Sequence, residues 1–367
     1  MCWHLVGTWV GVPWCTPTGF RVGTNGVPHS VDEGAHPRKS LDQPPLSSHS
    51  ILPRSHRECL RGHAGPLDGG RIDAPPTPRA IRTGPKCLRT RYDVIVVGTG
   101  PAGSVMAYRL ARAGLNVAVL ERGRAIEPGA FPESAGDLAK NAQLWRNGRR
   151  LGPADALFDL RVFDDLMVLT GCGVGGTSLI NASVSVMPDD QVMSDRRWPA
   201  EIRNDADWPA DVARVRAMVG AEELPQERTP GKLDALESMA TGDGLGGVAE
   251  RAPLNVSFCD GPNSTGAEMS ACNGCGNCMT GCNVGAKETY DRNYLHGARR
   301  WGASVYARCS VRQVSPTAHG WAVTVADTSH PSVRRRVEAD QVVLAAGALG
   351  STEILLRSRA EGLDVSP

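Results

Sequence analysis

Three glycines open a short segment that could hold a dinucleotide. Gly98, Gly100 and Gly103 have the spacing G-x-G-x-x-G. In this pattern the first glycine permits a tight turn, the second lets the backbone approach a pyrophosphate, and the third lets a helix pack closely on a strand. Glu121 ends the next apolar run, where an acid can accept a hydrogen bond from a ribose hydroxyl. An acid there disfavours a 2′-phosphate, so the pattern favours FAD or NAD over NADP.

The neighbouring residues could form the elements that such a site needs. Residues 92–97 are apolar and rich in β-branched side chains, which is typical of a strand buried on both faces. Pro101 suits the first turn of a helix, and with Ala102 it begins an amphipathic run that extends to residue 113. A second apolar strand is predicted over 116–120. The order of strand, glycine turn, helix, strand and acid predicts a Rossmann-like unit.

A second glycine-rich segment lies at residues 168–182, which read V-L-T-G-C-G-V-G-G-T-S-L-I-N-A. Its glycines, with Thr177 and Ser178, offer bare backbone N–H groups and hydroxyls to an anionic or hydrogen-bonding ligand. Taken alone, the segment is equally consistent with a tight loop in the core. Residues 341–356 then add a buried strand, a glycine turn and the start of a helix.

Four cysteines form a third candidate site. Cys272, Cys275, Cys278 and Cys282 have the spacing C-x2-C-x2-C-x3-C of a bacterial ferredoxin half-motif. This predicts a metal site, with an iron–sulfur cluster favoured over zinc because structural zinc usually takes two separated cysteine pairs. The alternative is a loop packed by unmetallated thiols. Asn283 departs from the motif, in which proline commonly follows the last cysteine.

Composition narrows the class of protein. The 367 residues have room for two domains, and a net charge of +1 argues against a general nucleic-acid binder. No run approaches the roughly 18 apolar residues of a membrane span, and residues 1–11 lack the basic start of a signal peptide. Four of the 11 cysteines crowd together, unlike a secreted disulfide framework. We therefore expect a cytoplasmic protein with no transmembrane segment and no nucleic-acid partner.

Residues 1–90 differ from the rest of the chain. They hold 11 Lys and Arg against 6 Asp and Glu, together with 12 Pro and 11 Gly, and they show no hydrophobic period. This composition predicts a disordered N-terminal extension, or a non-native one translated from upstream sequence.

The remaining segments predict mixed α and β structure. Apolar residues recur at helical spacing over 206–219 and 232–240. Further on, three alternating runs predict an antiparallel meander that leads back to a buried strand at 341–346. The three runs are 304–314, 321–326 and 333–337.

Together, the two glycine-rich segments and the late strand and turn resemble the GMC (glucose–methanol–choline) flavin oxidoreductases, and the cholesterol-oxidase-like branch most closely. The resemblance covers residues 91–363 and implies FAD as the cofactor. Two positions depart from the family pattern: Cys172 stands where a basic or amide residue is usual, and Ser185 where an aromatic residue or alanine is usual. The implied cofactor-binding residues are Gly98, Gly100, Pro101, Ala102, Gly103 and Glu121 for the ADP half, Gly175, Gly176, Thr177, Ser178 and Asn181 for a flavin-side loop, and Gly347 and Ala348 for a late turn.

The fold that follows is α/β (α+β mixed): a Rossmann-like FAD-binding domain with an inserted β-meander and a partial substrate domain. The resemblance places the catalytic histidine close to the family's C-terminus, a part that this chain lacks, so the catalytic residues are unknown. His296, His319 and His330 match no catalytic position. The predicted domains are the extension 1–90, a first FAD-binding part with the flavin-side loop over 91–186, a partial substrate region with the cysteines over 187–290, and a truncated second FAD-binding part with the meander over 291–367.

The predicted function is FAD-dependent oxidation of the CH–OH group of a hydrophobic alcohol or sterol, with hydride transfer to the flavin. The chain would be the N-terminal fragment of such an enzyme. Two alternatives stay open: a catalytically inactive FAD-binding fragment, and an iron–sulfur flavin dehydrogenase that passes electrons to an acceptor other than oxygen. The sequence identifies neither the substrate nor the electron acceptor.

Overall fold

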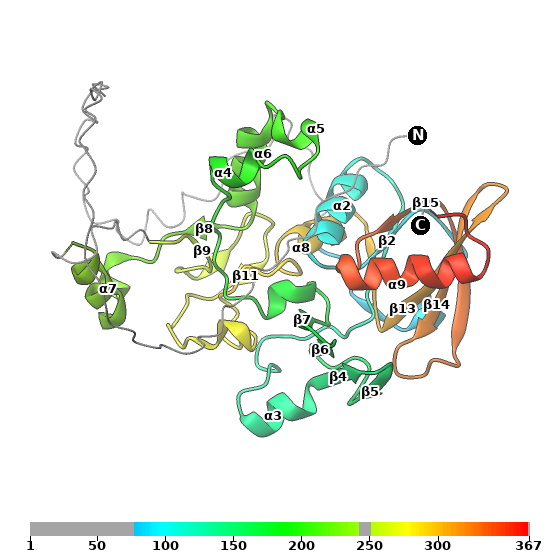
Figure 1. The fold of residues 1–367 in the computed structure, drawn as a ribbon, viewed down its shortest axis with the longest axis horizontal. Coiled ribbons are helices and arrows are strands. Elements are labelled where there is room, and N and C mark those ends of the chain that lie inside the picture. Colours follow the sequence, from blue (N-terminus) through cyan, green and yellow to red (C-terminus); the bar gives the residue numbers. More distant parts are fainter. Residues whose placement is uncertain (1–76, 242–250, 366–367) are drawn as a thin grey trace, which may run out of the picture.

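A seven-stranded sheet forms the centre of the described chain. The computed structural model describes residues 77–241 and 251–365. The strand order is β1-β12-β3-β2-β15-β14-β13, and Figure 1 labels β2, β13, β14 and β15 of this sheet. Neighbours from β1 to β15 pair in parallel, and β15, β14 and β13 pair antiparallel. The strands are β1 (Arg82–Thr83), β12 (Ser304–Ala307), β3 (Val117–Leu120), β2 (Arg91–Val97), β15 (Arg334–Leu344), β14 (Gly320–Asp327) and β13 (Cys309–Thr317).

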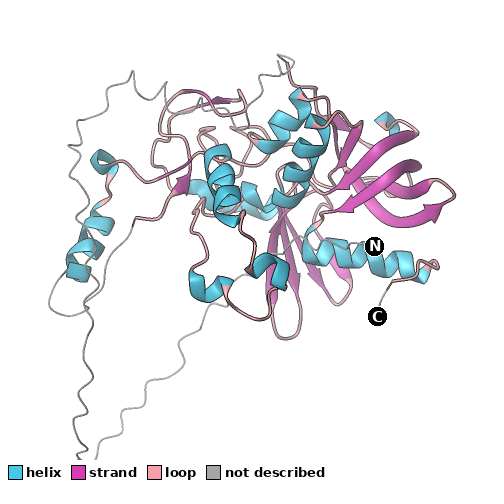
Figure 2. Ribbon diagram, turned by 90° about the horizontal axis from the view of Figure 1, so that it is seen from above, coloured by secondary structure: helices cyan, strands magenta, loops and turns pink. Residues whose placement is uncertain are grey.

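Helices cover both faces of this sheet and form a separate group beyond it (Figures 1 and 2). Two helices predicted from apolar spacing are confirmed within one or two residues as α6 and α7. The helices are α2 (Pro101–Arg112), α3 (Ala135–Lys140), α4 (Asp190–Met193), α5 (Ala200–Arg203), α6 (Trp208–Met218), α7 (Gly231–Thr241), α8 (Tyr294–Arg300) and α9 (Gly347–Ala360), with 3-10 turns η1 (Pro85–Cys87), η2 (Gly176–Leu179), η3 (Gln226–Arg228) and η4 (Asn277–Met279).

The predicted strand, glycine turn, helix and strand are present as β2, α2 and β3. Val94 and Val96 of β2 belong to the core cluster that contains α2 and α8 residues. Ile95 and Val97 belong to the cluster on the other face, with residues of the meander and of α9. Because both faces of β2 are buried, its sequence is apolar at successive positions. The predicted mixed α/β fold is confirmed.

The meander differs from the prediction in two places. The run 304–314 is divided at Arg308, whose φ of 54° turns the chain, into the parallel strand β12 and the antiparallel strand β13. The runs 333–337 and 341–346 belong mainly to one strand, β15, which ends at Leu344. The first half of β15 pairs with β14 and the second half with β2, so one strand joins the meander to the parallel part of the sheet.

A second, four-stranded sheet was not predicted and stands apart from the first (Figure 2). Its register places leucines opposite one another on all four strands, with Leu151 and Leu169 at the edges 68% and 50% exposed. Gln143 and Asp159 pair on the opposite face and are buried. The order is β5 (Arg149–Leu151), β4 (Ala142–Arg146), β6 (Phe158–Val162) and β7 (Met167–Gly171).

The folded chain begins before the predicted boundary at residue 91. β1 pairs with β12 in the main sheet, and Leu88 is 3% exposed in the core. Residues 1–76 of the predicted extension lie outside the described residues. Two small ribbons complete the fold, formed by β8 (Ala221–Glu222) with β9 (Leu254–Asn255) and by β10 (Gly261–Pro262) with β11 (Glu268–Met269). Within the described ranges, no helix combines the length and apolar character that a bilayer crossing needs.

Candidate functional site

The glycines of the first loop are required for different reasons. Gly98 has a φ of 101°, and a Cβ there would lie 2.4 Å from the carbonyl oxygen of Ala345. A Cβ on Gly103 would lie 2.0 Å from the carbonyl oxygen of Gly98. At Gly100, by contrast, a Cβ would have nothing within 4 Å. The first and third glycines therefore permit close packing, while the second faces open space where a ligand can approach.

The amino end of α2 is suited to a diphosphate. Its N-cap is Gly100, with no side-chain cap, and its first turn contains no acidic residue. Pro101 occupies the first helical position and Ala102 the second, so no bulky or charged side chain stands there. Free N–H groups and the helix dipole favour an anion at such an end.

Glu121 lies immediately after β3 and is 7% exposed. Its Oε2 accepts hydrogen bonds from the backbone N–H of Thr99 at 3.1 Å and from the Thr99 hydroxyl at 2.6 Å. Its Oε1 accepts one bond, from the N–H of Gly123 at 2.8 Å. A carboxylate oxygen can accept two, so Oε1 retains capacity for a ribose hydroxyl.

The second glycine-rich loop packs directly on the first. Gly175, in a left-handed conformation, donates its N–H to the Thr99 hydroxyl at 3.0 Å. A Cβ on Gly176 would lie 2.7 Å from Cα of Gly100. Thr99 thus connects Glu121 with both loops, and it was not predicted because it occupies a variable position of the glycine motif.

The polar side chains of this second loop hold its own backbone. Thr177 Oγ1 accepts from the N–H of Gly171 at 3.1 Å. Ser178 Oγ donates to the carbonyl of Gly175 at 2.8 Å. Asn181 Oδ1 accepts from the N–H of Ser183 at 3.2 Å. These side chains therefore hold the loop in shape. The groups that the loop can most simply offer to a ligand are then those of its backbone.

The predicted late turn lies next to the first loop. The N–H of Ala345 donates to the carbonyl of Val97 at 2.8 Å, directly before Gly98. Gly347 has a φ of 73° and begins α9, with Ala348 as the next residue. The structure therefore places this turn beside the glycine loop of α2.

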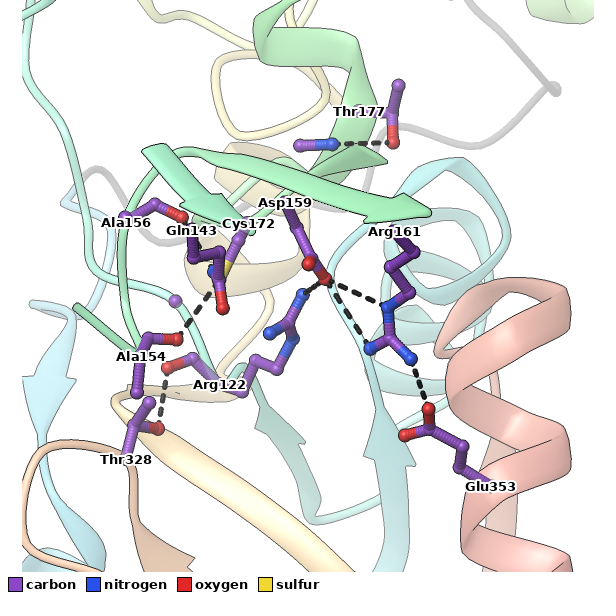
Figure 3. A network of polar contacts seen from close by, with 12 residues as sticks. Arg122, Gln143, Ala154, Ala156, Asp159, Arg161, Cys172, Thr177, Thr328 and Glu353 are labelled. Carbon is purple, nitrogen blue, oxygen red and sulfur yellow. Dashed lines mark hydrogen bonds and ion pairs between the residues drawn. The ribbon is translucent and has the colours of Figure 1, made fainter. Parts of the chain in front are cut away.

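A charge network ties the four-stranded sheet to this region (Figure 3). Asp159, 1% exposed, accepts from Arg122 and lies 3.4 Å from Nε of Arg161. Arg161 also pairs with Glu353 of α9. The network joins β6 to the residue after Glu121 and to the helix that begins at the late turn. A charge buried this deeply needs its partners, because an unpaired one is costly.

Cys172 lies close to this network (Figure 3). It is 1% exposed, and burial raises its thiol pKa to about 12. Its Sγ lies 4.0 Å from the carbonyl oxygen of Ala154. The residue that departs from the family pattern is therefore a neutral packing thiol at physiological pH and has no nucleophilic role.

The cysteine loop shows no assembled group of metal ligands among the described residues. Among residues 77–241 and 251–365, no three His, Cys, Asp or Glu side chains converge as metal ligands. Cys275 is exposed, while Cys272, Cys278 and Cys282 are half-buried. The metal site predicted from spacing is therefore not shown among the described residues, and the iron–sulfur alternative stays a prediction.

The end of the cysteine loop is held by a neighbouring segment of the chain. Asn283 accepts from the N–H groups of Gly129 and Phe131, each at 2.9 Å, and donates to the carbonyl of Phe131 at 3.0 Å and to Glu133 at 2.7 Å. The residue that replaced the ferredoxin proline thus anchors the loop to a neighbouring segment, and spacing along the chain does not by itself turn the thiols inward.

The histidines of the described chain have other partners. Burial, with Arg299 and Arg300 nearby, lowers the pKa of His296 to about 4, and its Nδ1 lies 3.2 Å from the Thr265 hydroxyl. His319 lies in the turn between β13 and β14. His330 lies beside Asp327, with 3.6 Å between Nδ1 and the carboxylate. We assign none of them as a catalytic base.

Comparison with known proteins identifies the family. A family model described as GMC oxidoreductase matches residues 92–362. The chain therefore belongs to the GMC oxidoreductase family, as the resemblance implied.

Its relatives include cholesterol oxidases of Acinetobacter baumannii, 30% identical over 74% of this chain and 51% of that protein, and of Mycobacterium tuberculosis, 31% identical over 75% and 49%. A long-chain-alcohol oxidase of Arabidopsis thaliana is 28% identical over 62% of this chain and 27% of that protein. The crystal structure of pyridoxine 4-oxidase from Mesorbium loti matches with a TM-score of 0.44 at 18% identity, covering 73% of this chain and 52% of that one. The chain spans about half the length of the cholesterol oxidases that it matches.

Proposed function

We propose that this chain supplies the FAD-binding part of an oxidoreductase that oxidises the CH–OH group of an alcohol. The observation that carries the proposal is the meeting of the two glycine loops, in which Gly176 packs on Gly100 beside the uncapped end of α2. The backbone of Gly100 is open to a ligand, since a Cβ on this residue would have nothing within 4 Å. Such a cradle suits the diphosphate of a dinucleotide.

Each part of the site has a role in this proposal. The N–H groups at the start of α2 would hold the diphosphate, and Glu121 Oε1 would accept from a ribose hydroxyl. The loop at Gly175 and the turn at Gly347 would contact the flavin half. The chemistry that FAD supplies when bound is acceptance of a hydride from the carbon that carries the hydroxyl.

We propose a hydrophobic alcohol, a sterol among the candidates, as the substrate class. The support is the similarity to cholesterol oxidases over three quarters of the chain and to a long-chain-alcohol oxidase. Because the chain spans about half the length of those cholesterol oxidases, turnover of such an alcohol is a proposal for this chain.

The test is to incubate the purified full chain with FAD, remove free flavin, and record the visible spectrum together with acid-released flavin. Cholesterol or a long-chain alcohol is then added without oxygen. Stoichiometric flavin that bleaches on addition supports the full proposal. Bound flavin that does not bleach identifies an inactive FAD-binding fragment, and folded protein without flavin contradicts the cofactor assignment.

A further inference from the structure

The flavin-side loop, residues 175–181, rests on a short segment much further along the chain. This segment, residues 287–291, is called the brace below. The ammonium group of Lys287 donates to the carbonyl oxygens of Leu179 at 3.1 Å and Asn181 at 2.7 Å. These carbonyls lie at the carboxyl end of the η2 turn, where a cation is favoured because terminal carbonyls lack partners within the turn.

Two further contacts come from the same brace. The N–H of Tyr290 donates to Ser178 Oγ at 3.1 Å. Asp291 lies against the start of the loop, since a Cβ on Gly175 would be 2.8 Å from its Oδ1. The brace therefore contacts the loop along most of its length, although more than a hundred residues separate them.

Lys287 is fixed on its other side by the cysteine loop. It is 2% exposed, and its third hydrogen bond goes to the carbonyl oxygen of Cys278 at 2.9 Å. An ammonium group has three donors, and the three carbonyls use all of them. A buried ammonium requires such complete satisfaction, because an unpaired one would be strongly unfavourable.

We propose that Lys287 is a positioning residue for the cofactor, which holds the flavin-side loop in its binding conformation and uses the cysteine loop as an outer support. This inference rests on the proposed function, because cofactor binding is itself proposed. It also gives the cysteine loop a role that needs no metal: its η4 turn supplies the carbonyl that completes the environment of the lysine.

The variant Lys287→Met keeps the length of the side chain but removes the three donors. The matched control is Lys140→Met, which removes a lysine that is 79% exposed on α3. The first measurement is amide hydrogen exchange of the full chain without FAD. We expect at least about tenfold faster exchange across residues 175–181 in Lys287→Met, since the carbonyls of Leu179 and Asn181 lose their donor. We expect no change across α2, and none in the control.

The second measurement is an FAD titration, after which the midpoint potential of the bound flavin is also determined. Lys287→Met should bind FAD about ten- to a hundredfold more weakly and shift the potential, whereas Lys287→Arg, which keeps a charged donor, should recover part of both. Loop exchange, affinity and potential all unchanged in Lys287→Met would overturn the inference. A wild-type chain that binds no FAD refutes the proposed function alone, and the exchange data still decide the role of Lys287.

If Lys287→Met does not fold, Ser178→Ala replaces it, because this change removes the acceptor of the Tyr290 N–H while it leaves the lysine in place. Exchange across the loop should then rise by a smaller factor than about tenfold. Unchanged exchange in Ser178→Ala would count against the brace.

Discussion

The two loops whose spacing predicted chemistry, residues 98–103 and 272–282, differ in what surrounds their glycines. A Cβ on Gly98 would meet backbone at 2.4 Å and one on Gly103 at 2.0 Å. At Gly274 and Gly276 a Cβ would have nothing within 4 Å. The first loop lies between a buried strand and a helix, whereas the middle of the second lies at the surface.

This difference shows when spacing predicts a site. In the first loop the neighbouring strand and helix enforce the conformation, so the motif and the structure agree. In the cysteine loop only the end is tightly packed, where a Cβ on Gly281 would lie 2.0 Å from the ring of Phe131. Burial and the neighbouring Cys282, Cys272 and Cys275 raise the pKa of Cys278, so the four thiols are near one another in space, but among the described residues no three of them are grouped as metal ligands.

The largest expected difference between the two loops is in the free energy of unfolding that is lost when one glycine is replaced by alanine. Gly98→Ala combines an unfavourable positive φ with a clash against backbone, and we expect it to lower the free energy of unfolding by more than about 3 kcal/mol. Gly274→Ala has a φ of 75° but open space, so we expect a loss of only about 1 kcal/mol. Urea unfolding measures both, and equal losses would contradict the comparison.

A smaller effect tests the brace, which lies between the flavin-side loop and the cysteine loop. Burial raises the pKa of Glu288 to about 7, against 4.5 for the ordinary side chain. The folded protein therefore retains the proton longer than the unfolded chain, so its stability falls as pH rises from about 4.5 to about 7. Glu288→Gln removes this penalty and should gain roughly 1–3 kcal/mol at pH 8, and almost nothing at pH 4.

Urea unfolding across this pH range measures the effect, with Glu268→Gln as the control at an exposed glutamate. A gain that does not depend on pH would show that the Glu288 carboxyl is not the cause.

The smallest effect is expected at the surface of the cysteine loop. Cys275 and Cys87 are both exposed, so Cys275→Ser and the control Cys87→Ser should each change the free energy of unfolding by no more than about 0.5 kcal/mol. Iron and acid-labile sulfide, assayed in anaerobically purified chain, should be absent from the wild type and from both variants. Iron in the wild type that Cys275→Ser removes would restore the metal prediction.

The sequence predicted β2, α2 and β3 because several signals coincide there. The apolar strand, the first and third glycines and the acid each constrain the same turn, through packing or through hydrogen bonds. The partners of Glu121 could not be predicted, since Thr99 contributes a hydroxyl whose position depends on the meeting of two distant loops. Lys287 was missed for the same reason: its acceptors are distant in sequence.

The sequence contains a local signal for the hairpin of the four-stranded sheet. Asn147 and Gly148, with φ of 50° and 72°, form the turn between β4 and β5. Asn-Gly between extended segments is a strong indication of a tight hairpin. The sequence predicted the long strand β15 as two separate strands. The pairing partner of β15 changes along its length, and the alternation of apolar and polar residues does not reveal such a change.

The central claim is that the space beside Gly100 receives the diphosphate of FAD. Gly100 has an ordinary φ of −65° and open space at its Cβ, so Gly100→Val should stay within about 1 kcal/mol of the wild type in urea unfolding. The measurement is an FAD titration of the wild type and this variant. We predict that the wild type binds FAD and that Gly100→Val binds it at least about tenfold more weakly. Equal affinity in a folded variant would contradict the claim.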